Sequence, residues 1–165
     1  MSDVKIYEWE VAEIGHESPP YVYEMTGEKI ADYCRGVGYE NPVYLNDGAA
    51  REMGFPGVFA PPTMVYTYAP QRRHDIMNAR GYIAPEQSEH APRSTSFVST
   101  EIRFQARLVR PGDIVTSSTR VEDKFHRRGN KFITFRVTAH NQDSELVAEY
   151  DYVCLWERPS GPASA

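Results

Sequence analysis

The sequence has only two cysteines among its 165 residues, Cys34 and Cys154, and their spacing matches no metal or redox motif. We therefore expect two buried free thiols rather than a disulfide. No apolar run approaches the ~18 residues that a membrane span needs, and the acidic N-terminus does not resemble a signal peptide. These absences predict a soluble, cytoplasmic protein, and the length favours a single domain.

The sequence also lacks a block of basic residues, and its formal net charge is −5. Residues 1–60 carry 11 acidic and 4 basic side chains, whereas residues 61–165 carry 12 acidic and 14 basic ones. This balance argues against nucleic acid as a partner. No metal site is predicted, because the five histidines do not follow the spacing of metal-ligand motifs, and no cofactor is predicted either. These histidines are His16, His74, His90, His126 and His140.

The first part of the chain predicts an arm, a strand and short helices. Residues 1–19 form the expected N-terminal arm, and residues 21–25 alternate as a short strand does. Thr26 is placed to cap a helix, and Asp47 is placed to cap a second, short helix that ends near Met53. The apolar positions of the first helix follow helical spacing at Ile30, Tyr33, Cys34 and Val37.

The middle of the chain predicts a buried helix and then a long polar loop. Proline is tolerated in the first turn of a helix, so we expect a helix over residues 61–69 with Met64, Val65 and Tyr68 on its buried side. A second helical piece is expected within residues 71–80, after the break at Pro70. Residues 81–94 are polar, and a loop of this length inside a domain is more often functional than accidental.

The rest of the chain predicts four strands, over residues 97–109, 114–125, 131–141 and 146–156. The last two alternate cleanly, which suits antiparallel strands with one wet face. Early helices followed by long strands indicate an α+β fold in which a curved antiparallel sheet wraps around one helix. We expect a single such domain over residues 20–157, and a flexible tail over residues 158–165 that is rich in Pro, Gly and Ser.

One segment carries a family signature. Residues 38–63 contain Asn41-Pro42, then Asp47, Ala49-Ala50, Gly54-Phe55 and Ala60. This frame resembles the signature of the MaoC-like (R)-specific enoyl-CoA hydratases and 3-hydroxyacyl dehydratases, which have a hotdog fold. The resemblance covers roughly residues 20–157 and implies one hotdog unit, because no internal repeat is present.

The chain departs from that family at the positions that carry its chemistry. Adding water to an enoyl thioester needs a base, an acid and an amide that stabilises the thioester oxygen. The family's catalytic Asp and His positions hold Tyr39 and Tyr44, and its glycine amide position holds Pro62. A phenol, whose pKa is ~10, is a weak base at neutral pH, and proline has no N–H to donate. The resemblance is therefore closest to the N-terminal-half or non-catalytic type of subunit.

The resemblance implies a subunit of a heteromeric hydratase or dehydratase that binds the acyl part of acyl-CoA or another acyl thioester beside a catalytic hotdog partner. No catalytic residue is assigned, although Glu40 is a candidate acid or base. Residues 81–94 are expected to cover the mouth of the acyl channel. The bases of the second half are better placed than those of the first to meet a phosphorylated carrier such as coenzyme A, but the sequence does not name the residues that contact its phosphates. The residues expected to bind substrate flank the signature: Tyr39, Asn41, Tyr44, Phe59, Thr63, Val65 and Tyr66.

Two other functions stay open at this point. The chain is a self-sufficient, homomeric hydratase if Glu40, Tyr39 or Tyr44 takes an altered role, and it is a non-enzymatic acyl-thioester-binding protein if none does. A thioesterase is disfavoured, because residues 64–69 contain no acid. In each case a homo- or hetero-oligomer is expected, because a single hotdog sheet leaves its edge strands unpaired. The sequence names neither the acyl group nor the direction of the reaction.

Overall fold

The structure is a computed structural model that describes residues 5–159. The tail expected over residues 158–165 lies outside the described residues from position 160 onward. The strands are β1 (Lys5–Ile6), β2 (Tyr21–Glu24), β3 (Tyr82–Ile83), β4 (Ser96–Phe104), β5 (Ile114–Arg127), β6 (Asn130–His140) and β7 (Leu146–Glu157). The helices are α1 (Gly27–Val37), α2 (Asp47–Glu52), α3 (Val65–Tyr68) and α4 (Arg73–Asn78), with 3₁₀ turns η1 (Pro42–Tyr44), η2 (Pro62–Met64) and η3 (Pro85–Gln87).

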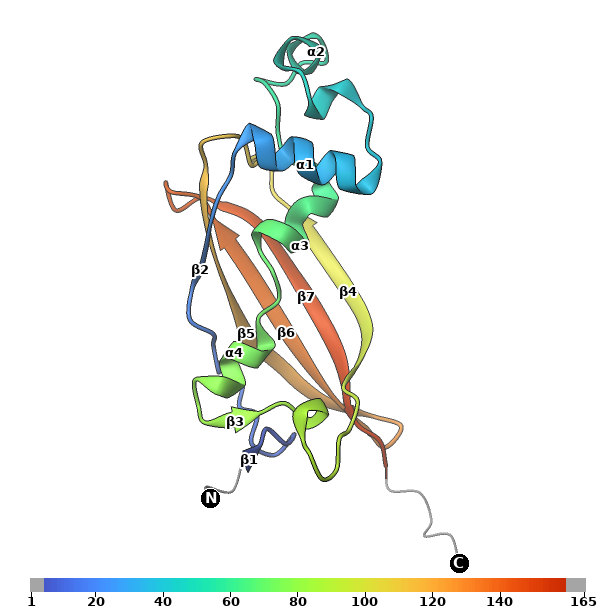
Figure 1. Ribbon diagram of the computed structural model, residues 1–165. Coiled ribbons are helices and arrows are strands. Elements are labelled where there is room, and N and C mark those ends of the chain that lie inside the picture. The colour runs from blue at the N-terminus through green and yellow to red at the C-terminus, as the bar shows by residue number, and fades with distance from the viewer. Residues whose placement is uncertain (1–4, 160–165) are drawn as a thin grey trace, which may run out of the picture.

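The fold is built on a five-stranded antiparallel sheet with strand order β2-β5-β6-β7-β4. The sheet curves around α3, while α1 and α2 lie at one end and α4, β1 and β3 at the other (Figure 1). The α+β arrangement predicted from the sequence is therefore confirmed. The strands β4 and β2 form the two edges of the sheet.

The alternation of β6 and β7 gives the sheet one buried face. In β6 the side chains of Ile133, Phe135, Val137 and Ala139 are buried, as their period of two predicted. In β7 the same face carries Ala148, Tyr150, Cys154 and Trp156, all of them at most 1 % exposed. Both cysteines of the chain are buried thiols, as predicted. Burial raises the pKa of Cys154 to about 11, so this thiol stays protonated at neutral pH.

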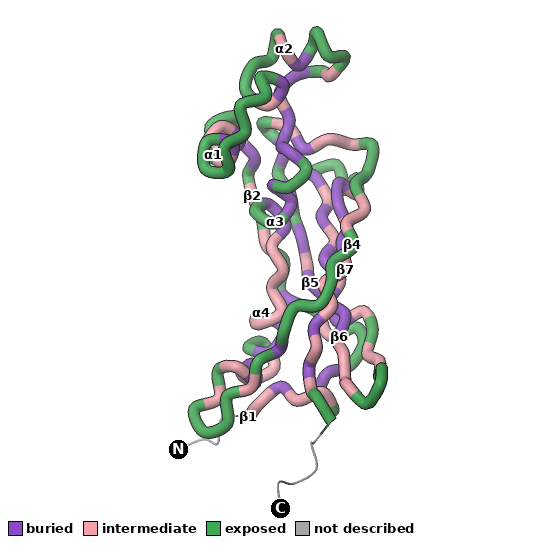
Figure 2. The backbone as a smooth tube through the Cα atoms, turned by 90° about the vertical axis from the view of Figure 1, so that its right-hand side faces the viewer, coloured by how far each residue is buried: buried purple, intermediate pink, exposed green. Residues whose placement is uncertain are grey.

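The central helix is buried as predicted, but it is shorter than predicted. The turn η2 and the helix α3 cover residues 62–68, and the helix ends at Ala69, which has φ −136° and ψ 67°, just before Pro70. Its side chains Met64, Val65 and Tyr68 lie in the core. No helix within residues 5–159 is both long enough and apolar enough to cross a membrane. Figure 2 shows that α3 combines buried and exposed positions, whereas α1 and β4 are mostly intermediate or exposed.

One buried hydrogen bond fixes the end of α3 against the sheet. The Tyr150 hydroxyl donates to the carbonyl oxygen of Ala69 at 2.7 Å, and both residues are fully buried. We expect Tyr150→Phe to lower the free energy of unfolding by about 1–2 kcal/mol, because the Ala69 carbonyl would be left buried without a partner. Urea denaturation measures this. The control Tyr66→Phe, which removes an exposed hydroxyl 3.4 Å from Thr100 Oγ1, is expected to change stability by less than about 0.5 kcal/mol; equal losses in the two variants would contradict the assignment.

Two local predictions were wrong. The second helix is capped by Asn46, whose side chain accepts from the Ala49 N–H, and not by Asp47. Asp47 instead accepts from the Val58 N–H at 2.8 Å and so ties α2 to the chain that enters the central helix. Val37 is 48 % exposed rather than buried, because it lies in the last turn of α1, beyond the reach of the sheet.

Residues 81–94 do not cover the mouth expected beside the signature segment. They contain β3 and η3 and lie at the end of the sheet opposite α1 and α2 (Figure 1). Their partner is the N-terminal arm, because β1 pairs in parallel with β3. The arm also places Tyr7, which is fully buried, in a core cluster with Trp156 and Ile76. Within one chain this segment is therefore structural.

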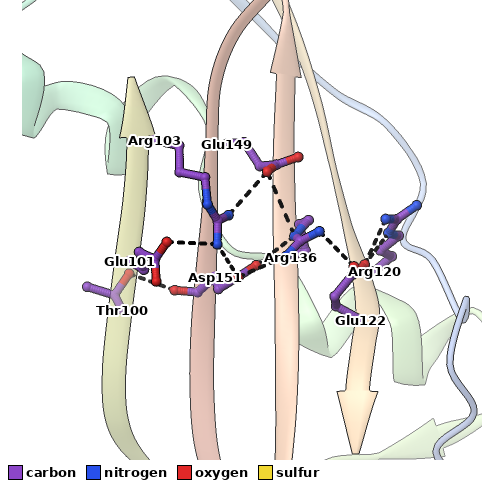
Figure 3. A network of polar contacts seen from close by, with 8 residues as sticks. All are labelled: Thr100, Glu101, Arg103, Arg120, Glu122, Arg136, Glu149 and Asp151. Atoms are coloured by element: carbon purple, nitrogen blue, oxygen red, sulfur yellow. Dashed lines mark hydrogen bonds and ion pairs between the residues drawn. The ribbon is translucent and has the colours of Figure 1, made fainter. Parts of the chain in front are cut away.

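The outer face of the sheet carries an ion network that joins four strands (Figure 3). Arg136 contacts both carboxylate oxygens of Asp151, at 2.7 and 2.9 Å, and also Glu122 at 2.7 Å. Arg103 reaches the same Asp151 at 2.7 Å and Glu149 at 3.1 Å. Burial alone would raise the pKa of Asp151, but the hydrogen bonds from Arg136 and Arg103 together lower it. These arginines are thus occupied by carboxylates of the same sheet.

Candidate functional site

The signature segment is positioned by the end of α1. Gly38 has φ 72°, a left-handed conformation that favours glycine, and its N–H closes the helix on the Cys34 carbonyl. The chain then turns, and the Asn41 side chain accepts from the Val43 N–H to cap η1. This local geometry brings Tyr39 and Tyr44, five residues apart in the sequence, to within 6.3 Å between ring centroids.

A cavity of about 470 Å³ opens at this segment and at the start of the central helix. It contains four of the seven residues predicted to bind substrate, namely Tyr39, Asn41, Tyr44 and Thr63, together with the candidate Glu40. Two further lining residues were not among the predicted binders, Gly38 and Pro62. We call this cavity, with these seven lining residues, the tyrosine pocket.

Aromatic rings form a wall of the tyrosine pocket. The Tyr39 and Tyr44 rings are stacked at an interplanar angle of 26°. Behind them, Phe59 meets the Tyr44 ring edge-on at 5.2 Å. Burial, with smaller contributions from Tyr39 and Cys34, raises the pKa of Tyr44 above its usual value. The Tyr44 phenol is therefore an even weaker base at neutral pH than free tyrosine, and the wall it forms is suited to apolar groups.

The structure does not bring the other three predicted residues to the tyrosine pocket. Phe59 is 6 % exposed and supports Tyr44 from behind, and Val65 is fully buried in the main core. Tyr66 is 43 % exposed and packs edge-on against Tyr150 at 5.2 Å, on the side of the helix that faces β4. Positions 63 and 65 cannot share one face, because residues two apart lie about 200° from each other around a helix.

Sequence reasoning missed the role of Tyr33. Its helical spacing with Ile30 and Cys34 placed it on the buried side of α1, but its hydroxyl donates to Thr63 Oγ1 at 2.9 Å. The Tyr39 hydroxyl lies 3.2 Å from the same oxygen. A tyrosine on a helix face that meets the signature segment is the signal that points to such a contact. Three hydroxyl groups therefore meet beside the tyrosine pocket.

The basic residues of the second half are mostly occupied elsewhere. At the tip of the β5–β6 hairpin, Lys124 donates to the Ala12 carbonyl at 2.5 Å and Lys131 contacts Glu10 and Glu157. Arg103 and Arg136 are held in the ion network described above. Glu40, the charged residue among the lining seven, is exposed. The structure thus gives the tyrosine pocket a weakly acidic rim and no cluster of cations for phosphates among its lining residues.

The tyrosine pocket lacks the acid, the base and the amide donor that the resembling family uses to hydrate an enoyl thioester. Tyr39 and Tyr44 stand where the resembling family has a carboxylate and an imidazole, and Pro62 lines the tyrosine pocket without an N–H to offer. No group of three His, Cys, Asp or Glu side chains that could hold a metal ion is found in residues 5–159. What the tyrosine pocket offers is aromatic surface and hydroxyl groups, which bind an organic group more readily than they transfer its protons.

Comparison of the sequence with known proteins identifies a family for this chain. Residues 12–150 match the family model described as FAS1-like, dehydratase domain region. A UPF0336 protein of Streptomyces coelicolor is 30 % identical over 135 residues, which is 81 % of this chain and 85 % of that protein.

One sequence match and one structural match come from Mycobacterium tuberculosis. The 3-oxo-4,17-pregnadiene-20-carboxyl-CoA hydratase alpha subunit is 24 % identical over the whole of this chain, which spans 55 % of that subunit. A chain of the crystal structure of the ChsH1–ChsH2 complex superposes with a TM-score of 0.66 at 24 % identity, covering 90 % of this chain and 88 % of that one.

Proposed function

The chain belongs to the FAS1-like dehydratase domain family and has the hotdog fold of the MaoC-like hydratases, and from this premise we propose that it is the acyl-binding subunit of a heteromeric enoyl-thioester hydratase or 3-hydroxyacyl-thioester dehydratase. The tyrosine pocket holds the acyl group, and a second hotdog chain supplies the acid, the base and the amide donor. The carrier is coenzyme A or another thioester-forming group.

The observation that carries this proposal is the content of the tyrosine pocket. All three catalytic positions of the family lie on its wall, and all three hold residues unsuited to the reaction: Tyr39, Tyr44 and Pro62. The same substitutions enlarge the aromatic surface, because the Tyr39 and Tyr44 rings stack on one another. A site that has lost its chemistry but kept an organised cavity is suited to binding the apolar part of a substrate that reacts elsewhere.

Names of similar proteins support a partner. One relative is described as an alpha subunit of a CoA hydratase, and one similar fold was solved in a two-component complex. In this chain the edge strand β4 exposes Phe97, Val98 and Phe104, each about half accessible, and among residues 5–159 it pairs only with β7. An exposed apolar edge strand offers unpaired backbone groups to another chain. We propose that β4 is where the second hotdog chain is joined.

We expect the purified chain to be at least a dimer, and Val98→Lys to weaken its dimerisation about tenfold or more, because a charge on an edge strand opposes pairing. Val22→Lys is the matched control, since Val22 is 60 % exposed on β2, the opposite edge. Sedimentation or light scattering at micromolar concentrations measures both. A stable monomer in the unaltered chain, or equal effects of the two substitutions, would contradict an interface at β4.

One observation favours a second candidate function. Glu40 lines the same cavity as the two tyrosines, so a homomeric hydratase in which Glu40 acts as acid or base is the alternative. If this alternative holds, the chain alone hydrates enoyl thioesters, and Glu40→Gln abolishes that activity. A chain that binds acyl thioesters, does not hydrate them and finds no catalytic partner would instead be a non-enzymatic binding protein.

A further inference from the structure

The hydroxyl cluster beside the tyrosine pocket has one proton more than its own hydrogen bonds use. Three hydroxyl groups, on Tyr33, Thr63 and Tyr39, are joined by two hydrogen bonds of 2.9 and 3.2 Å that meet at Thr63 Oγ1. Each hydroxyl can donate one proton. Two bonds use two of the three protons, so one O–H group is left to donate outside the cluster.

The geometry limits where that proton is. The Tyr33 hydroxyl donates its proton to Thr63 Oγ1, so the O–H group that is not used within the cluster belongs to Thr63 or to Tyr39. Both of these residues line the tyrosine pocket, whereas Tyr33 does not. Within residues 5–159 neither hydroxyl has a further hydrogen-bond partner. Whichever of the two carries it, the spare donor belongs to the wall of the pocket.

The other neutral polar groups of the tyrosine pocket add to this excess of donors. The side-chain oxygen of Asn41 accepts from the Val43 N–H at 3.1 Å, which fixes the orientation of the amide. Its NH₂ group, which can donate two protons, makes no hydrogen bond within residues 5–159. The Tyr44 hydroxyl has no hydrogen-bond partner in the part of the chain that the structure describes. A purely hydrocarbon ligand would leave these donors without acceptors if it displaced their water.

We propose that the tyrosine pocket recognises an acyl thioester whose acyl part carries a second acceptor oxygen, a ketone or a hydroxyl group, and that the spare O–H of the Thr63–Tyr39 pair donates to it. This rests on the proposed function, in which the catalytic partner holds both the thioester carbonyl and the hydroxyl group that the reaction adds or removes. The oxygen bound here is therefore a different one, farther along the acyl group. The aromatic wall of Tyr39 and Tyr44 contacts the carbon skeleton around it.

The test compares decanoyl-CoA with a set of oxodecanoyl-CoA isomers in which the ketone is moved along the chain. Calorimetry on the full-length protein gives the ratio of the two dissociation constants. For at least one isomer, we expect the dissociation constant of the ketone divided by that of decanoyl-CoA to be about three- to tenfold larger in the double variant Thr63→Val with Tyr39→Phe than in the unaltered protein. This is the amount expected for the loss of one neutral hydrogen bond. The infrared C=O stretch of that bound ketone should lie at lower wavenumber in the unaltered protein than in the double variant.

The single variants make the test specific. Thr63→Val leaves the Tyr39 O–H, and Tyr39→Phe leaves the Thr63 O–H, so each should keep most of the preference that the double variant loses. Tyr33→Phe is the matched control, because it removes a hydroxyl of the same cluster without removing the spare donor, and it should keep the preference as well. If the hydroxyl groups had only a structural role, all four variants would instead bind decanoyl-CoA and its ketone isomers more weakly by the same factor.

The possible failures are distinguishable. If both kinds of ligand bind and no isomer changes its ratio in the double variant, the proposed recognition of a second oxygen is wrong while acyl binding stands. Equal weakening of the binding of all ligands in the double variant, with the single variants unaffected, means that the donor meets the thioester carbonyl, which also overturns the inference. If neither decanoyl-CoA nor any isomer binds, the proposed function fails for coenzyme A thioesters, and the inference fails with it.

Discussion

Purified alone, the chain is expected to hydrate crotonyl-CoA at least about 10⁴-fold more slowly than a hotdog hydratase with a complete signature. General acid–base catalysis contributes about 10²–10⁴-fold, and one oxyanion donor about 10²–10³-fold. Tyr39, Tyr44 and Pro62 replace the residues that would supply all of these. The raised pKa of Tyr44 lowers the fraction of phenolate still further at neutral pH.

The measurement is the loss of the enoyl thioester, followed with crotonyl-CoA and with a longer trans-2-enoyl-CoA. Adding a hotdog protein with an intact Gly-Asp-x-Asn-Pro-x-His signature is expected to give turnover, and a gene for one beside this gene would identify it. Robust turnover by the chain alone, lost in Glu40→Gln or Tyr44→Phe, would contradict the subunit assignment and establish the homomeric enzyme. The unaltered chain and both variants must be shown to fold equally well by circular dichroism.

The sheet could be predicted because the sequence patterns that indicate its strands and turns are local. A period of two in β6 and β7 sorts each side chain to one face, and turn residues such as Gly129 separate the strands. The buried face then follows without any knowledge of the partner strands. The same holds for the central helix, whose apolar positions Met64, Val65 and Tyr68 are buried as expected.

What escaped prediction depends on contacts between distant parts of the chain. Nothing near Tyr82 in the sequence indicates that β3 pairs with Lys5–Ile6 of the arm, so the segment looked like a free loop. Long-range pairing of this kind has no local pattern to detect. The polar residues of that segment are likewise used internally, since Glu86 contacts Arg73 at 2.7 Å and Thr95 at 3.0 Å.

The candidate site was half predictable for a related reason. Tyr39, Asn41, Tyr44 and Thr63 come together because the signature is a compact turn against the start of the helix. Phe59 and Val65 flank the same signature, but their side chains point to the core. Distance along the sequence placed them near the site, and only the path of the backbone decides which way each one faces. These seven assignments remain a proposal about binding.

The last prediction concerns the charges that hold the outer face of the sheet. Arg136 stands between Asp151 and Glu122, with a side chain only 22 % exposed (Figure 3). We expect Arg136→Met to lower the free energy of unfolding by about 2–3 kcal/mol at pH 7, because among the described residues Asp151 would keep only Arg103, and Glu122 only Arg120, as a cationic partner, so partly buried negative charge would be undercompensated. Arg120→Met is the matched control: Arg120 is 48 % exposed, and its one ion pair in the part of the chain that the structure describes is with Glu122, so about 0–1 kcal/mol is expected.

The effect of pH separates lost charge from lost packing. The pKa of Asp151 is lowered in the folded chain, so its contribution is fully present above the unfolded value of ~3.9 and is lost as the pH falls through the folded value. The stability gap between the unaltered chain and Arg136→Met should therefore be full at pH 7 and should narrow below about pH 4. Denaturant titrations across this range measure the gap. A gap that stays constant down to the acid limit would mean that Arg136 acts through its aliphatic stem, and that the network contributes packing rather than charge to the sheet.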